Sequence, residues 1–339
     1  MDTSRANPIF SSMEKRIKLK HLDSKRALIL CYHGVTKEIS RGIENFSDKH
    51  LNADVFADQM EFVANELHPI SMQELISDKK AGRFNERSVA VTFDDGYENN
   101  YTTAWPILKK FQIPATIYLT TGYIGNQKPF WVDLIEHIFN HYPARTLNVQ
   151  IKENQYSYRT DSPETKIQSL KDLKERLKRY PVGVAEETID KLAEEVPSLP
   201  DWRSIPNFGI MNWGQIREMQ EDDLITIGSH TVNHNLLSVM QPEELEAEVG
   251  GARRDIKEIL GVLTDLFAYP NGQERDFNQQ SLDYLTRSGF TSAVTTIPDL
   301  IKIRDDPLQL NRYAIGFGLN FPFTRKSLLS IKHFLRGKR

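Results

Sequence analysis

Two groups of side chains in this sequence have the residue types and spacing that hydrolytic chemistry requires. Asp94 and Asp95 are adjacent and Gly96 follows them, and His230 and His234 lie four residues apart. Two neighbouring carboxylates can divide the work, because one can bind a cation while the other accepts a proton. Two imidazoles and one carboxylate form a three-ligand set that leaves positions for water or substrate, which is typical of a catalytic metal site.

Both groups directly follow predicted strands. Residues 88–93 form an apolar, β-branched run before the two carboxylates, and residues 224–228 form another before His230. Aspartate is a poor strand residue, so the pair is expected at the carboxyl end of its strand, where α/β folds build their sites. The spacing of the two histidines fits one face of a helical turn. Two unrelated surface histidines on a helix are the alternative.

Predicted strands and helices alternate along most of the chain, which indicates an α/β fold with a mainly parallel sheet. The strands are expected at 27–32, 88–93, 115–119, 224–228, 264–269, 291–295 and 308–315, and the helices at 54–67, 99–111, 131–139, 242–260 and 276–288. Polar residues gather just after the strands, which suits a barrel with its site at one face. An open doubly wound sheet is the competing architecture. Residues 142–206 are rich in Lys, Glu and Asp and predict a helical insertion, with helices at about 162–179 and 185–195.

Composition narrows the class of protein. The chain has 339 residues and a formal net charge of -3, which does not indicate a nucleic-acid partner. Its single cysteine, Cys31, rules out an intrachain disulfide and a cysteine-based zinc site. No run reaches the roughly 20 apolar residues of a membrane span, and the N-terminus lacks the apolar segment of a secretory signal, so a cytoplasmic location is expected. Oligomeric state leaves no signal in the sequence.

The last residues, 321–339, combine basic side chains with interleaved Leu, Ile and Phe. A basic amphipathic helix can lie on a membrane surface, so this tail predicts peripheral membrane contact. A terminal helix that packs on the domain is the alternative.

Four segments resemble the motifs of the polysaccharide deacetylase family, also called the NodB-homology or carbohydrate esterase family 4 domain. Residues 92–96 (TFDDG) and 229–234 (SHTVNH) resemble its first two motifs, residues 267–272 (FAYPNG) its third, and residues 211–213 (MNW) the segment with its site tryptophan. The resemblance spans about 27–315 and implies a distorted (β/α) barrel. The expected organisation is an N-terminal extension at 1–26, a barrel at 27–320 with the insertion at about 142–206, and the basic tail at 321–339.

The resemblance also implies roles for individual residues. Asp95, His230 and His234 match the family's metal ligands, and Asp94 matches its general base. The implied reaction is metal-dependent removal of an N-acetyl or similar small acyl group from an amino sugar of a polysaccharide or glycan precursor. Zinc suits two histidines and a carboxylate best, although cobalt, nickel, manganese and iron use similar sets. The backbone N–H of Tyr97 is a candidate donor to the oxyanion.

Two residues of the family pattern are missing here, so other residues must take their roles. Members typically place an arginine three residues before the third-motif proline, where this chain has Phe267, and they carry a late Leu-x-His that is absent here. Residues 30–35 (LCYHGV) resemble the circularly rearranged poly-N-acetylglucosamine deacetylase branch, in which the acid histidine follows the first strand. His33 is therefore the expected general acid, with a buried structural histidine as the alternative. Arg312 is expected to pair with Asp94, with a surface arginine on the last strand as the alternative.

The remaining expectations concern the substrate. Tyr97, Trp213, Tyr269 and Asn271 are predicted to contact it, although the aromatic residues could instead pack in the barrel. Asp133 and Glu136 are interpreted as solvated helix residues.

Two other functions stay open. The absent third-motif arginine would fit a catalytically weak barrel that binds carbohydrate, and the site would also fit a metal-dependent hydrolase of non-sugar amides. A cytoplasmic deacetylase would act on a nucleotide-linked or lipid-linked glycan intermediate.

Overall fold

The computed structural model describes residues 18–126, 128–196, 199–201 and 205–316. The predicted membrane-contacting tail at 321–339 and most of the N-terminal extension lie outside the described residues, so both remain predictions. No helix in the described ranges combines the length and the apolar character that crossing a membrane requires.

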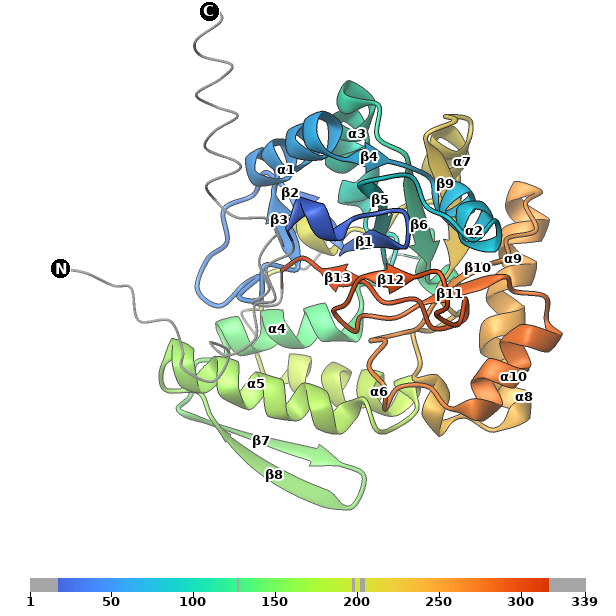
Figure 1. Cartoon of the computed structure of the whole chain (residues 1–339). Coiled ribbons are helices and arrows are strands. Elements are labelled where there is room, and N and C mark those ends of the chain that lie inside the picture. Colours follow the sequence, from blue (N-terminus) through green and yellow to red (C-terminus); the bar gives the residue numbers. More distant parts are fainter. Residues whose placement is uncertain (1–17, 127, 197–198, 202–204, 317–339) are drawn as a thin grey trace, which may run out of the picture.

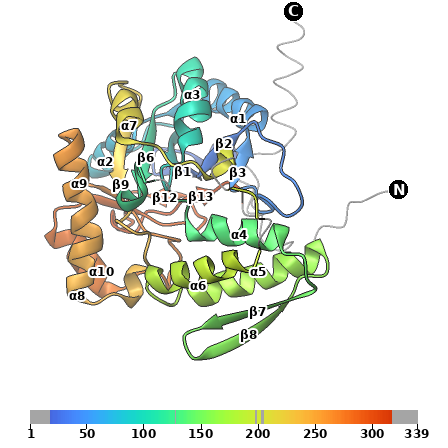
Figure 2. The ribbon, with the colours of Figure 1, turned by 180° about the vertical axis from the view of Figure 1, so that it is seen from behind.

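A curved, mainly parallel sheet forms the centre of the described chain (Figures 1 and 2). Within the described residues its main path runs β11–β10–β9–β6–β5–β1–β12, while β13 also pairs with β1 and β4 with β5. These strands are β1 (Arg26–Tyr32), β4 (His68–Pro69), β5 (Ser88–Phe93), β6 (Ala115–Leu119), β9 (Ile225–Ser229), β10 (Leu266–Ala268), β11 (Ser292–Val294), β12 (Ile301–Lys302) and β13 (Tyr313–Ala314). Every residue of β5 is buried, as expected for a parallel strand covered on both faces.

The last segment of the described chain runs between the two ends of this sheet. Leu310 forms a parallel bridge with Val294 of β11, and β13 pairs in parallel with Leu30 and Cys31 of β1. The sheet therefore curls into the distorted barrel that was predicted rather than an open doubly wound sheet. Arg312 lies between these two pairings, in what we call the closing seam (residues 310–314).

Helices cover the outside of the sheet. They are α1 (Ala53–Glu66), α2 (Met72–Lys80), α3 (Trp105–Phe111), α7 (Trp213–Gln220), α8 (Pro242–Leu245), α9 (Gly251–Leu260) and α10 (Gln279–Arg287), and a small sheet pairs β2 (Gly34–Thr36) with β3 (His50–Asn52). The helices predicted at 99–111 and 242–260 each contain a π-helical turn, at 100–104 and 246–250. Asn52 caps α1 by accepting hydrogen bonds from the backbone N–H groups of Asp54 and Val55.

The insertion forms a separate layer with its own apolar cluster (Figure 1). It follows α4 (Trp131–His141) and comprises β7 (Thr146–Ile151), β8 (Asn154–Arg159), α5 (Pro163–Leu177) and α6 (Val182–Glu194). The two helices were expected, but the antiparallel hairpin was not. Leu147, Val149 and Ile151 alternate with exposed polar residues in β7, a short period-two signal that is hard to see in a charged region.

Candidate active site

The carboxyl ends of β1, β5, β9 and β10 open into one cavity with a volume of about 470 Å³. Seven of the predicted site residues line it: His33, Asp94, Asp95, Tyr97, His230, His234 and Asn271. The insertion contributes Lys174, Lys178 and Arg179 to the same lining. Parallel strands deliver their following residues to one edge of a sheet, so residues far apart in the sequence meet here.

Asp95, His230 and His234 converge in this cavity. One potential ligand atom from each lies within 4.8 Å of the others. The Nε2 atoms of both histidines are 3.5 Å from Oδ1 of Asp95. That oxygen is buried and has no hydrogen-bond partner among the described residues. A buried carboxylate oxygen is expected to have a partner, so this group fits a divalent metal ion.

The two histidines are held by a loop, so the expectation that they share a helical turn is wrong. Thr231 and His234 both adopt positive φ angles, 67° and 60°, in the chain after β9. The Thr231 hydroxyl accepts a hydrogen bond from the backbone N–H of His234 at 2.9 Å, and Glu248 accepts one from the N–H of Asn233 at 2.8 Å. These side-chain contacts stabilise the turn in place of helical hydrogen bonds.

Hydrogen bonding and burial keep the histidines in the form that a metal needs. Nδ1 of His230 donates to the carbonyl of Ala268 at 2.8 Å, which leaves Nε2 unprotonated and turned toward Asp95. Burial lowers the pKa of His230 and of His234. For Asp95, burial and the neighbouring charge of Asp94 raise the pKa to about 8. The carboxyl group must therefore lose a proton when a metal binds.

We expect the affinity of this site for Zn²⁺ to fall about tenfold for each pH unit below about 8, since one proton competes for Asp95. Competition titrations against a chromophoric chelator, from about pH 6 upward, measure this slope. The matched control is Asp95→Asn. The zinc-binding component that the wild type has and this variant lacks should show the tenfold fall in affinity per pH unit. A lost component whose affinity is constant with pH would contradict the prediction.

Asp94 is paired with Arg312, as predicted from the sequence. The two guanidinium nitrogens Nη1 and Nη2 donate to Oδ1 and Oδ2 of Asp94 at 2.7 and 2.6 Å. Arg312 is fully buried, and it also donates to the Thr92 hydroxyl and to the carbonyl of Thr295. The surface alternative for Arg312 is therefore wrong. Burial acts to raise the pKa of Asp94, but Arg312 outweighs it and holds the pKa well below its usual range.

His33 and Phe267 complete the comparison with the expected pattern. His33 follows β1 and lines the cavity, and Asn100 donates a hydrogen bond to its backbone carbonyl at 2.7 Å. Burial lowers the pKa of His33 to about 3, so its ring is neutral before substrate reacts. Phe267 lies in β10, fully buried against Phe290 and Tyr269. Arg312 from the closing seam thus pairs with Asp94 in place of the arginine that the family pattern expects at position 267 of β10.

The predicted substrate contacts divide into two groups. Tyr97 and Asn271 line the cavity, whereas Trp213 and Tyr269 do not. Tyr269 is fully buried, its ring stacks on Phe277 at 4.3 Å, and its hydroxyl donates to the carbonyl of Leu308 at 2.9 Å. The structure thus assigns Tyr269 to the core instead of the expected sugar-stacking role. Trp213 begins α7, half-buried and beside Gly125.

We expect Tyr269→Phe to lower the free energy of unfolding by about 1 kcal/mol, because it removes one buried hydrogen bond and keeps the ring packing. Urea denaturation measures this change. Because the ring does not reach the cavity, KM and kcat should equal those of the wild type. A several-fold rise in KM in a variant of unchanged stability would restore the substrate-binding role.

A buried polar network beside the cavity was not anticipated. Lys49 donates to the Tyr97 hydroxyl at 2.9 Å and pairs with Asp133, and the Tyr97 hydroxyl donates to Asp133 at 2.8 Å. Lys174 pairs with Glu136 at 3.2 Å. The interpretation of Asp133 and Glu136 as solvated is wrong, since both are buried. No sequence signal indicated this burial, because both residues lie on the polar side of the amphipathic helix α4.

Comparison with known proteins finds a matching family and named relatives. A family model described as polysaccharide deacetylase matches residues 81–198 and 204–293. A Staphylococcus aureus protein named poly-beta-1,6-N-acetyl-D-glucosamine N-deacetylase is 34% identical over 130 residues, which cover 35% of this chain and 43% of that protein. The Staphylococcus epidermidis protein of the same name is 34% identical over 125 residues, covering 33% of this chain and 42% of that protein. The alignments thus span less than half of these relatives.

Two solved structures share the fold. The Streptococcus pyogenes deacetylase PplD in complex with acetate has a TM-score of 0.58 and 20% identity, and the match covers 91% of this chain and 98% of that one. IcaB from Ammonifex degensii has a TM-score of 0.55 and 20% identity, covering 92% and 97%.

Proposed function

This chain belongs to the polysaccharide deacetylase family, and from that premise we propose that it hydrolyses the N-acetyl group of an amino sugar in a glycan. The observation that carries the proposal is the arrangement of the cavity. A three-ligand group, a carboxylate held ionised by a buried arginine, and a neutral imidazole all line or adjoin one space of about 470 Å³. Binding alone would not require an ionised carboxylate beside a metal-ligand group.

The proposed roles follow from the contacts. Asp95, His230 and His234 would hold the metal ion, for which we propose Zn²⁺. When bound, the ion supplies Lewis acidity toward the amide carbonyl and lowers the pKa of water. Asp94, ionised and oriented by the two hydrogen bonds from Arg312, accepts the proton of the attacking water. We assign the backbone N–H of Tyr97 as a donor to the oxyanion that develops on the substrate.

His33 is proposed to protonate the leaving amine. Its ring is neutral in the free protein, since burial lowers its pKa to about 3. Negative charge that develops on the substrate beside the ring raises the pKa of an imidazole. His33 can therefore take up the proton that Asp94 accepted from the water and pass it to the nitrogen as the C–N bond breaks, which returns Asp94 to its ionised form.

The relatives' names direct the choice of substrate. Because the Staphylococcus proteins are named for poly-β-1,6-N-acetyl-D-glucosamine, we propose β-1,6-linked N-acetylglucosamine residues as the substrate class. Tyr97 and Asn271, which line the cavity, are proposed to contact the sugar. Oligosaccharides of this linkage test the proposal whether the glycan is a polymer, lipid-linked or nucleotide-linked.

The test is acetate release by the zinc-loaded full chain from β-1,6-linked N-acetylglucosamine oligosaccharides, with new primary amines measured in parallel. β-1,4-linked oligosaccharides and N-acetylated amino acids serve as comparison substrates. The proposal expects both products from the β-1,6-linked sugar, and none from Asp94→Asn. Stoichiometric metal without acetate from any glycan would favour the carbohydrate-binding alternative. Acetate from the N-acetylated amino acids alone would favour the non-sugar amidase.

A further inference from the structure

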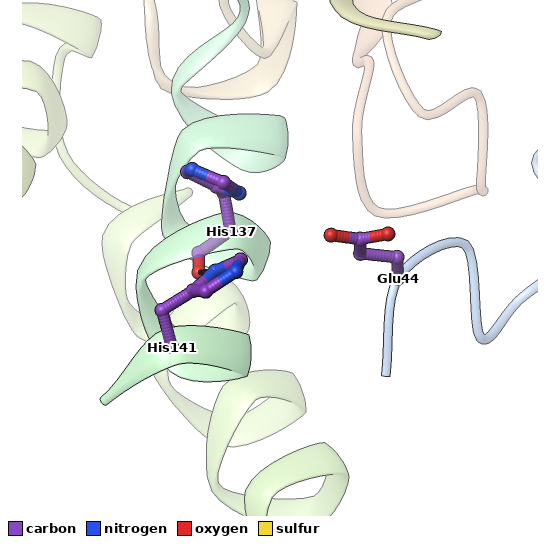
Figure 3. A group of neighbouring side chains, drawn as sticks. All are labelled: Glu44, His137 and His141. Atoms are coloured by element: carbon purple, nitrogen blue, oxygen red, sulfur yellow. Dashed lines mark hydrogen bonds between the residues drawn. The ribbon is translucent and has the colours of Figure 1, made fainter. Parts of the chain in front are cut away.

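A second group of metal-ligating side chains lies outside the catalytic cavity. His137 and His141 are on α4, four residues apart, and Glu44 precedes β3 in the segment at 41–47. One potential ligand atom from each lies within 4.8 Å of the others. Figure 3 shows the two imidazoles on successive turns of α4 and the carboxylate of Glu44 facing them. None of the three lines the catalytic cavity, and none belongs to the group formed by Asp95, His230 and His234.

The hydrogen bonds of the two rings leave one nitrogen of each available. Nε2 of His137 is 2.9 Å from the carbonyl oxygen of Pro200, and Nδ1 of His141 is 3.0 Å from the carbonyl oxygen of His137. A carbonyl only accepts, so each of these nitrogens carries the proton. The remaining nitrogen of each ring is then unprotonated, which is the form that binds a metal, and a carbonyl partner on the far nitrogen is typical of a metal-ligating histidine.

The buried nitrogen of His137 is the second observation that points to a ligand. His137 is 1% exposed, and its Nδ1 has no hydrogen-bond partner among the described residues. Leaving a buried acceptor without a partner is unfavourable, and an ion beside it would remove that cost. The edge of the ring also meets Phe208, with the centroids 5.9 Å apart, so the ring orientation is set by packing.

Two hydrogen bonds hold the carboxylate of Glu44 in place. The side chain of Asn140 and the backbone N–H of Arg41 donate to its two carboxylate oxygens, at 3.2 and 3.3 Å. Hydrogen bonds of this kind orient a ligating carboxylate and leave lone pairs free. Glu44 and His141 are half-buried, so an ion can enter from solvent.

We propose that Glu44, His137 and His141 form a second binding site, for a divalent transition-metal ion of the zinc type. Two imidazoles and one carboxylate favour zinc, cobalt or nickel over calcium and magnesium, which prefer all-oxygen sites. Ligand atoms of a tetrahedral zinc ion are about 3.3 Å apart, so small side-chain rotations would close the observed group around the ion.

The ion would link two segments that border the catalytic cavity, residues 41–47 and α4. The 41–47 segment already hydrogen-bonds to α4, where Asn140 accepts from the N–H of Ile43 at 2.9 Å and Glu136 accepts from the N–H of Asn45 at 2.5 Å. Ser47 from this segment and Glu136 from α4 both line the cavity. The second ion is therefore assigned a structural role, holding the insertion side of the cavity against the chain that enters β3.

The experiment counts bound Zn²⁺ in the chelator-treated full chain by equilibrium dialysis and elemental analysis. Wild type should bind two equivalents. Asp95→Ala, which removes a catalytic-site ligand, should keep one, and Asp95→Ala/His141→Ala should bind none. His141 is chosen over the buried His137 because its removal disturbs the core less. His68→Ala, at an exposed histidine, is the matched control and should bind two.

A second readout uses stability. Added Zn²⁺ should raise the Tm of Asp95→Ala, because a ligand that binds only the folded state stabilises it, and should leave the Tm of the double variant unchanged. If Asp95→Ala misfolds, His141→Ala alone should bind one equivalent where wild type binds two. Equal zinc content and equal Tm shifts in variants with and without His141 would overturn the proposal. None of these measurements uses deacetylase activity, so the result is independent of the proposed function.

Discussion

Asp94→Asn is expected to lower kcat for acetate release by about 10²–10⁴-fold, the usual contribution of a general base. Asparagine has nearly the same shape as aspartate but cannot accept the proton of the attacking water. Asp94 is 2% exposed and lines the cavity beside the metal-ligand group. No other described carboxylate has both this position and this charge state, so none can take over the role of the base. Steady-state kinetics on N-acetylglucosamine oligosaccharides measure the effect.

The variant needs a control for folding, because it also removes the counter-charge of Arg312. Breaking one side of a buried ion pair costs about 3–5 kcal/mol of stability. Metal content separates the two effects. Asp94→Asn should retain the ion held by Asp95, His230 and His234, whereas Asp95→Asn should lose it. A fully metal-loaded, folded Asp94→Asn protein with a rate within about threefold of wild type would remove Asp94 from the role of general base.

Arg312→Met is expected to lower kcat/KM at neutral pH by about 10²-fold and to lower the free energy of unfolding by about 3–5 kcal/mol. Methionine keeps much of the volume but removes the charge and both hydrogen bonds to Asp94. Burial, which acts to raise the pKa of Asp94, then loses its main opposing influence, so the pKa rises and the base is protonated over more of the pH range. The acidic limb of the rate profile should therefore move to higher pH.

The same ion pair predicts a pH dependence of stability. In the wild type, the folded-state pKa of Asp94 lies below its unfolded value, so the pair contributes its full stability above about pH 4 and loses it as pH falls toward the folded pKa. In Arg312→Met the folded pKa is raised, so the ionised carboxyl destabilises the fold as pH rises. The difference in unfolding free energy between the two proteins should therefore narrow below about pH 4.

Two further variants test whether Arg312 acts through Asp94. Arg312→Lys keeps the charge but not the two-pronged geometry, so its rate should fall between those of wild type and Arg312→Met. Asp94→Asn/Arg312→Met removes both charges and should be more stable than the sum of the single changes implies. Additive losses of stability, or a pH profile of Arg312→Met identical to that of wild type, would show that Arg312 only packs the seam.

Local sequence was sufficient to place the candidate ligands and the candidate base at strand ends, and the resemblance to the family supplied their expected roles. The runs before Asp94 and before His230 are apolar and β-branched, and each stops at polar residues, so the strands and the contents of their ends follow from short-range pattern. The alternation of strands and helices then predicts that those ends meet at one face, which the cavity confirms. His33 was chosen because residues 30–35 resemble the rearranged branch of the family, in which the acid histidine follows the first strand.

Tertiary structure decided the features that depend on pairs of residues distant in the chain. The ligand loop after β9 is held by Glu248, and the Lys49–Asp133 pair joins segments 84 residues apart. The core position of Tyr269 likewise depends on a tertiary contact, the stacking of Phe277 on its ring, because an aromatic residue after a strand suits a core and a sugar site equally well.

The pair of Asp94 and Arg312 shows both contributions. The sequence, through its resemblance to the family, indicates a base without its usual arginine partner and offers Arg312 as a candidate. Whether that arginine was buried or solvated depended on closure of the barrel, which carries residues 310–314 across from β11 to β1. A contact between residues 218 positions apart leaves no periodic trace in a single sequence. Only the folded chain brings the two charges together in a buried place, where each offsets the desolvation cost of the other.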